Sequence, residues 1–243
     1  MKMLTFAKRC AKEILRDPIN LGFGLGFPLV LLLLLSAIQA NIPVSLFEID
    51  NLTPGITVFG LSFLTLFSAT LIAKDRESAF LQRLYTTPLT GMDFILGYLL
   101  PLFPIVLGQT AICYLAAIPL GLTVGVEILY AIMGILPMAV FNIALGLLCG
   151  SLLGVKQVGG ICGALLTNLS AYLSGVWFDL KLVGGAFEKI AYALPFVHAV
   201  EMERALFVGD FSAAAQHMLP VLFYSLLATL AAIFCFLGQM RKQ

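Results

Sequence analysis

The chain has 243 residues, of which 60% are apolar and 11% are charged, and its formal net charge is +1. Soluble domains carry roughly 25% charged residues, so this chain cannot hydrate its whole surface and must expose much of it to lipid. The small net charge also excludes nucleic acid as a partner, because no basic stripe is present to neutralise phosphates.

Residues 2–16 are expected to form an amphipathic helix ahead of the first apolar run. The apolar face of this helix repeats at helical spacing and consists of Met3, Ala7, Cys10, Ala11 and Ile14. A basic amphipathic helix of this kind lies in the membrane interface. It serves either as a positively charged anchor or as a docking surface for a cytoplasmic partner, and both readings stay open. Asp17 and Pro18 then predict the N-cap and the first position of the next helix.

Crossing the hydrocarbon core takes roughly 20 apolar residues, and six segments meet this requirement. We expect transmembrane helices over residues 19–40, 53–73, 94–120, 128–153, 159–178 and 219–238. A cleaved signal peptide is the alternative for the first segment, but its charged lead and its apolar run are both too long for one. The predicted fold class is an all-α membrane protein with a single transmembrane domain over residues 1–243.

Basic residues predict the orientation of these spans. Eleven of the 14 lysines and arginines flank the spans on one side, and the other three, Lys181, Lys189 and Arg204, share the loop after the fifth span. Both termini are therefore expected in the cytoplasm after six crossings (N-in, C-in).

Residues 74–93, between the second and third spans, form the largest cytoplasmic loop. Apolar residues recur there at helical spacing, and Thr87-Pro88 ends the expected helix. A short amphipathic helix that projects from the membrane in this way is a candidate lever for a soluble partner.

The outer segment over residues 179–218 is too apolar for a free loop. Gly184-Gly185 and Pro195 divide it into short pieces. We expect re-entrant or interfacial helices packed on the bundle, because irregular backbone at membrane depth is tolerated only where protein covers it.

Signals for catalysis and metal binding are weak. The sequence has no G-x-x-x-x-G-K-[ST] motif, so this chain does not bind a nucleotide through a P-loop. The two histidines, His198 and His217, and the five cysteines lack metal-ligand spacing, and we expect the cysteines to be reduced thiols. Glu201-Met202-Glu203-Arg204 only superficially resembles the paired glutamates of intramembrane proteases.

None of the six segments contains Asp, Glu, Lys, Arg or His within its apolar run. Proton- or sodium-coupled carriers usually hold such a group, or a broken-helix ion site, near the middle of the membrane. If this protein transports, its energy is expected to come from a partner.

Two stretches of the chain resemble the permease subunit of type-2 ABC exporters, and the order of elements is similar over nearly the whole chain. The more specific stretch is Arg76-Glu77-Ser78-Ala79-Phe80-Leu81-Gln82-Arg83-Leu84 followed by Thr87-Pro88, which is similar to the family's charged, glutamate-containing loop ending in Thr-Pro. The family usually has Gly-Thr where this chain has Ala79-Phe80. The weaker stretch is Ser174-Gly175-Val176-Trp177-Phe178 leading to Leu194-Pro195-Phe196-Val197-His198-Ala199-Val200-Glu201.

The resemblance implies a complex of four subunits. A separate cytoplasmic ATPase would bind ATP and magnesium, this chain holding no cofactor or metal of its own, and a second permease, identical or homologous, would complete the membrane part. The coupling helix that inserts into the ATPase would include Glu77, Ser78, Phe80, Leu81, Gln82, Arg83 and Leu84, with residues 2–16 alongside it.

In this family the substrate path lies between the two permeases and is lined largely by the second and fifth spans. The candidate residues are Phe59, Phe63, Phe67, Thr65, Asn168 and Tyr172. An aromatic cavity with a few hydrogen-bonding groups suits an amphipathic or apolar small molecule, such as a drug, an antibiotic or a lipid-like compound. The alternative is that the phenylalanines face lipid or the core and that the hydroxyls bond their own helix.

We therefore expect the permease of an ATP-driven exporter in the cell membrane. An ATP-independent carrier or channel and an intramembrane enzyme are the alternatives.

Overall fold

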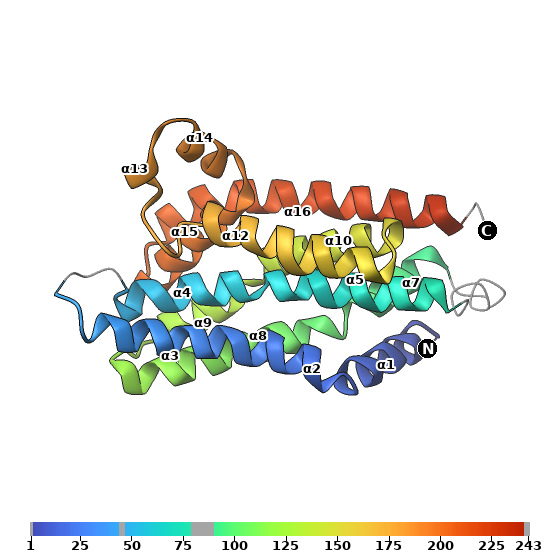
Figure 1. Ribbon diagram of the computed structural model, residues 1–243, viewed down its shortest axis with the longest axis horizontal. Helices are drawn as coiled ribbons and strands as arrows, with labels where there is room; N and C mark the ends of the chain where they lie inside the picture. Colours follow the sequence, from blue (N-terminus) through green and yellow to red (C-terminus); the bar gives the residue numbers. More distant parts are fainter. Residues whose placement is uncertain (1, 44–46, 79–89, 241–243) are drawn as a thin grey trace.

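The computed structural model describes residues 2–43, 47–78 and 90–240, and this part of the chain is helical throughout, without a strand. The helices form an elongated bundle, and the first and last described residues lie at the same end of it (Figure 1). This end also carries α1 (Lys2–Leu15), the amphipathic helix that the sequence predicts. We call it the α1 end, and we call the opposite end the distal end.

Five helices in the described ranges are long and apolar enough to cross a membrane, and they confirm five of the six predicted spans. They cover Pro18–Gln39, Ile49–Glu77, Gly91–Leu120, Glu127–Leu152 and Phe211–Gln239. Most spans consist of consecutive shorter helices. The first contains α2 (Pro18–Leu21), a π-helical turn (Gly22–Gly26) and α3 (Phe27–Gln39), and the second contains α4 (Ile49–Gly60) and α5 (Ser62–Glu77). The third contains α7 (Gly91–Leu99), α8 (Leu102–Ala117) and a 3-10 turn (Ile118–Leu120), the fourth contains α9 (Glu127–Gly134) and α10 (Leu136–Leu152), and the last lies in α16 (Phe211–Met240).

The fifth predicted span, 159–178, is helical over a different range and is not among these five. It consists of α11 (Val155–Val158), a π-helical stretch (Gly159–Leu166) and α12 (Thr167–Leu173). The helix ends at Leu173 because Gly175 turns the chain with a φ of 71°. The sixth crossing therefore remains a prediction.

The second span lies at the centre of the bundle. In its most apolar stretch 89% of the residues are buried, against 22% in the first and last spans. Two glycines on α10 allow its backbone to approach α5 closely. A Cβ atom on Gly146 would lie 2.6 Å from the Thr65 carbonyl oxygen, and one on Gly150 would lie 2.7 Å from the Ala69 carbonyl oxygen. Small residues spaced four apart permit this packing of spanning helices.

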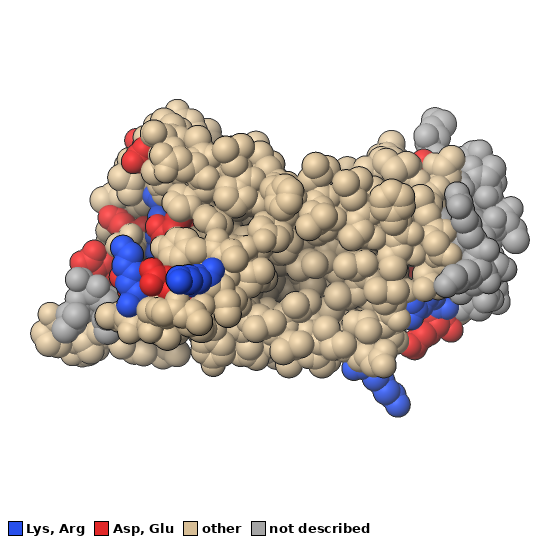
Figure 2. All heavy atoms as spheres, turned by 90° about the horizontal axis from the view of Figure 1, so that it is seen from above, with Lys and Arg blue, Asp and Glu red and all other residues tan. Residues whose placement is uncertain are grey.

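The charged side chains are gathered at the two ends of the bundle. Figure 2 shows Lys, Arg, Asp and Glu at both ends of the visible face, with a band of other residues between them. A surface of this kind fits a hydrocarbon layer bounded by water on each side.

The segment over residues 179–218, which the sequence predicts on the outer side, is helical and shorter than expected. It contains α13 (Leu180–Val183), α14 (Gly185–Ala193) and α15 (Pro195–Val208), and α15 packs on α16, α4 and α9. The last helix begins at Phe211 rather than near 219, because the Asp210 carboxylate accepts a hydrogen bond from the Ala213 N–H (3.0 Å) and caps the helix before its apolar stretch begins.

Candidate functional site

Four consecutive charged residues, Lys74 to Glu77, form the last turn of α5 at the α1 end. The sequence prediction places them in a loop, but the helix continues through them and Ser78 is its C-cap. Successive helical residues project about 100° apart. The four side chains therefore reach several neighbouring elements, and we call these four residues the α5 terminal cluster.

Asp75 is the buried member of the α5 terminal cluster, with 2% of its surface exposed. Its carboxylate accepts hydrogen bonds from Nη1 and Nη2 of Arg9 at 2.5 and 2.6 Å, and a third from the Tyr98 hydroxyl at 2.8 Å. A bidentate arginine contact of this kind is strong and geometrically specific. Asp75 thereby fixes α1 and α7 to the end of the second span.

Arg9 is the ionic link between α1 and α5. Its guanidinium also pairs with Glu13 at 2.6 Å. Burial alone would lower the pKa of Arg9, but the hydrogen bonds and charge of Asp75 raise this pKa above its ordinary value. The arginine is therefore charged at every physiological pH.

The apolar face of α1 completes this contact. Phe6 packs edge to face on Phe94 and Tyr98, with ring centroids 5.4 and 5.0 Å apart. Cys10 is fully buried, and burial raises the pKa of its thiol to about 12. In the structure α1 is thus a docked element of the bundle, in contact with protein through its apolar face.

Arg76 and Glu77 bind the connection between α10 and α11. Arg76 donates hydrogen bonds to the carbonyl oxygens of Ser151 and Leu153, the latter at 2.8 Å. Glu77 accepts a hydrogen bond from the Val155 N–H at 2.9 Å. A cation at the last carbonyls of one helix and an anion at the first N–H groups of the next both complement the helix dipoles.

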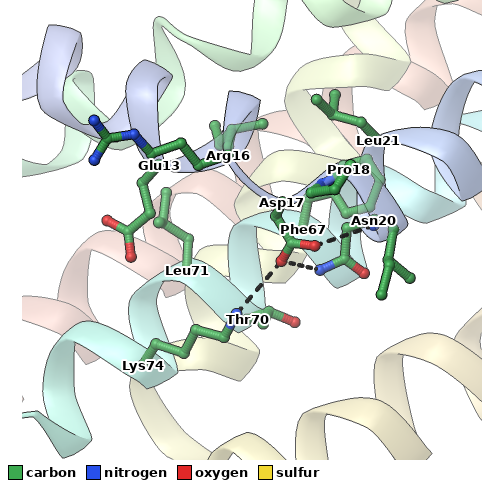
Figure 3. A pocket seen from close by; sticks show the side chains of 12 residues that line it. Glu13, Arg16, Asp17, Pro18, Asn20, Leu21, Phe67, Thr70, Leu71 and Lys74 are labelled. Carbon is green, nitrogen blue, oxygen red and sulfur yellow. Dashed lines mark hydrogen bonds and ion pairs between the residues drawn. The ribbon is translucent and has the colours of Figure 1, made fainter.

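Lys74 reaches the corner between α1 and α2, with its Nζ 3.4 Å from Oδ2 of Asp17. The Asp17 side chain also accepts a hydrogen bond from the Asn20 N–H at 3.2 Å, which confirms the predicted N-cap. Burial would raise the pKa of Asp17, but the Asn20 hydrogen bonds and Lys74 lower it. This corner and Phe67 and Leu71 of α5 line a pocket of about 280 Å³. Figure 3 shows Lys74 reaching Asp17 at this pocket.

The predicted coupling residues are only partly described. Glu77 and Ser78 belong to the end of α5, as above. Phe80, Leu81, Gln82, Arg83 and Leu84 lie outside the described residues, as does Thr87-Pro88. The description resumes at Thr90, which caps α7 through a capping box with Asp93.

The predicted path residues of the second span lie in the core of this chain. Phe59, Phe63 and Phe67 are 5%, 8% and 5% exposed. Phe27 of α3 lies 5.4 Å from Phe63, and Trp177 lies 5.5 Å from Phe59, between ring centroids. The phenylalanine stripe thus packs between the first span and the chain that follows α12.

Thr65 is also buried, and its hydroxyl donates to the Asn142 carbonyl oxygen at 2.9 Å. Asn168 and Tyr172 of α12 are placed differently, because both are exposed, Tyr172 by 55%. The Asn168 side-chain amide donates to the Ala164 carbonyl at 2.8 Å. The structure therefore does not gather the six path residues in one cavity of a single chain.

The sequence analysis does not predict the Arg9–Asp75–Tyr98 contact, because it counts Arg9 only among the basic residues that precede the first span. Arg9 and Asp75 are 66 positions apart. The local signal that could have found the contact is a basic residue directly beside the apolar face of the first helix.

The model of the family described as ABC-2 type transporter matches residues 1–208. This range includes α1, the α5 terminal cluster and α15. Among curated proteins, none matches the sequence closely enough to count as a relative.

Proposed function

Because the chain belongs to the ABC-2 type transporter family, we propose that it is the permease subunit of an ATP-driven exporter that moves an amphipathic or apolar small molecule outward. Its multiple spanning helices make it an integral membrane protein. The membrane domain of this family lacks an ATPase domain, so the ATPase would be a partner chain.

One observation carries the coupling role. The α5 terminal cluster leads directly into the predicted coupling loop, and its four side chains bind α1, α2, α7 and the connection between α10 and α11. A displacement of the loop by the ATPase would therefore act on several elements at once. Energetic coupling needs packed, ion-paired elements of this kind with two arrangements.

The distribution of charge supports the orientation. The α1 end carries Arg9, Lys74 and Arg76, and positive residues favour the cytoplasmic side. Both described ends of the chain would then be cytoplasmic, and α13 to α15 would lie on the outer side. The coupling loop would face the compartment that contains ATP.

An exposed apolar face on the π-helical stretch and α12 supports a second permease. Leu165, Leu169 and Tyr172 are 55%, 40% and 55% exposed, and they follow one another at helical spacing. A homologous or identical chain against this face would place Asn168 and Tyr172 at the boundary between two permeases. We propose this boundary as the substrate path.

The proposal is tested by purifying the chain with its cytoplasmic ATPase in lipid nanodiscs and measuring ATP hydrolysis with a panel of amphipathic drugs. We expect co-purification and stimulation by some compounds. Glu77→Ala should abolish the stimulation, because it frees the α10–α11 connection, while the matched outer-side change Glu188→Ala should leave it intact. A permease that moves these compounds in liposomes without ATP would instead show a carrier or channel.

A further inference from the structure

Arg204 of α15 makes contacts that neither the coupling site nor the substrate path uses. Its Nε donates to the Asn51 carbonyl oxygen at 3.2 Å, and its Nη2 donates to the Gly175 carbonyl oxygen at 3.4 Å. Its Nη1 donates to Oε1 of Glu201 at 2.8 Å, one helical turn away. Asn51 lies in the first turn of α4, and Gly175 lies in the turn that ends α12. One guanidinium thus joins the distal ends of the second span and of the α12 helix.

The chemistry of these contacts requires an arginine. A guanidinium presents several N–H groups in a rigid plane and can serve three acceptors in different directions, whereas a lysine ammonium is a single flexible point charge. The Gly175 carbonyl follows the end of α12, where backbone acceptors are left without helical donors. Glu201 holds the guanidinium in place through a charged hydrogen bond.

The helix that carries Arg204, α15, also contacts α8 and α9 through the residue next to Arg204. The neighbouring residue, Glu203, is fully buried and points toward α8 and α9. Its Oε1 accepts a hydrogen bond from the Tyr114 hydroxyl at 3.4 Å, and a Cβ atom on Gly134 would lie 3.6 Å from its Oε2. Burial raises the pKa of Glu203 well above its ordinary value. Adjacent residues of α15 therefore contact different elements, Arg204 the start of α4 and the turn after α12, and Glu203 the helices α8 and α9.

The contacts of Arg204 can also be exchanged for water. Arg204 and Glu201 border a cavity of about 670 Å³ at the distal end, which Gly175 and Trp177 also line. The Arg204 side chain is 23% exposed. Released groups would be hydrated in this cavity, so separation of the two helices does not leave a buried charge.

We infer that Arg204 is a positioning residue of the transport cycle, which holds the distal ends of α4 and α12 together with Glu201 and must release Asn51 and Gly175 when the outer side opens. We call these four residues the outer latch. The inference rests on the proposed function, because it assigns the latch to the outward-opening step of an ATP-driven cycle.

Hydrogen exchange of the permease–ATPase complex in lipid nanodiscs tests the outer latch, read from peptides over residues 49–58 and 171–180. In the wild type we expect slow exchange without nucleotide and faster exchange when the complex is trapped with ATP and vanadate. Arg204→Gln should raise nucleotide-free exchange in both peptides about tenfold, as for the loss of charged hydrogen bonds. Arg204→Lys keeps the charge but not the planar fork and should show the same increase. It serves as the second variant in case Arg204→Gln does not fold.

The matched control is Lys189→Gln, which makes the same charge change at an exposed position of α14. If the two peptides exchange at the same rate in Arg204→Gln, Arg204→Lys and this control, the latch is overturned. A wild-type complex that hydrolyses ATP while neither peptide responds to trapping would also overturn it and would leave the proposed function standing. If no ATPase associates with the chain, the proposed function fails. If nucleotide-free exchange in Arg204→Gln equals that of the wild type, Arg204 does not hold Asn51 and Gly175, whatever the outcome for the proposed function.

Discussion

Asp75 shows how one buried carboxylate can organise the end of a membrane protein. It lies in the last turn of the second span and accepts three hydrogen bonds from two other helices. Removing one partner of a buried ion pair costs about 3–5 kcal/mol. The cost here should be lower, because the Arg9 side chain is 33% exposed and can recover hydration.

Asp75→Asn should release α1, with Cys10 as the reporter. The Cys10 thiol has a pKa of about 12 while α1 is docked, so only about one thiol in 10,000 is ionised at pH 8. A loss of about 2 kcal/mol raises the undocked population roughly 30-fold. Maleimide labelling of Cys10, followed by peptide mass spectrometry at pH 8, should accelerate accordingly.

Glu188→Gln provides the control for this labelling, because it removes an acid from α14 at the distal end of the bundle. Equal labelling rates of Cys10 in the wild type, Asp75→Asn and Glu188→Gln would show that Asp75 does not hold α1.

Asp17 should make the α1–α2 corner sensitive to acid. Its pKa in the folded protein lies below the ordinary value of 3.8. A carboxyl whose pKa is lowered by folding contributes stability at pH values above its unfolded pKa, and this contribution is lost as the pH falls through the folded pKa. Asp17→Ala should therefore cost about 1 kcal/mol at pH 7. In thermal unfolding scans, the difference from the wild type should shrink below about pH 4, and a difference that stays constant down to pH 3 would contradict the assignment.

The second span and α12 have different roles in a single chain. The phenylalanines of α4 and α5 are buried, with Phe63 against Phe27 of α3 and Phe59 against Trp177, whereas Asn168 and Tyr172 of α12 are exposed. Buried aromatic residues contribute mainly packing energy, and truncating one costs about 3–5 kcal/mol.

Phe63→Ala and Asn168→Ala should therefore separate stability from transport. Phe63→Ala should lower the thermal unfolding temperature of the purified permease, because it opens a cavity beside Phe27. Asn168→Ala should leave this temperature within the error of the wild type and change drug-stimulated ATP hydrolysis of the complex. If neither variant changes the stimulation while Glu77→Ala abolishes it, the substrate path along α5 and α12 is wrong.

The elements that sequence reasoning found are those with local signals. The spacing of apolar residues predicts α1, and the Asp17-Pro18 pair predicts the start of the first span, because periodicity and capping involve neighbours in the chain. The end of α5 was predicted too early, since charged residues mark the end of an apolar run but are compatible with a continuing helix. The predicted start of α16 is too late for a related reason, because Ser212, Gln216 and His217 interrupt its first two turns ahead of the apolar run.

The contacts of the site could not be read in the same way. Asp75 meets Arg9 across 66 positions, and Arg204 meets Asn51 across 153. The same limit applies to His198 and His217, which are 19 positions apart and lie with their Nδ1 atoms 3.0 Å apart. The helical pattern gives the face of each residue but not the helix that covers it, so the phenylalanine stripe remained ambiguous between core and path.

In the molecule as a whole, polar contacts hold both ends of the second span. An ion pair and hydrogen bonds hold it at the α1 end, and hydrogen bonds from Arg204 hold its distal end. Asp75, Arg76 and Glu77 bind neighbours at the first of these ends, and Arg204 binds the Asn51 carbonyl at the other. The stretch between them is the most buried span of the bundle. A motor acting on the α1 end would thus move a helix that is connected to the outer segment.

The most direct test is transport by the reconstituted complex. Proteoliposomes holding the permease and its ATPase should accumulate a fluorescent amphipathic compound that stimulates ATP hydrolysis, with the ATPase face outward. We predict uptake with ATP and magnesium, no uptake with ADP, and no ATP-driven uptake with Glu77→Ala. Equal uptake by the permease alone, without ATPase or ATP, would contradict the account.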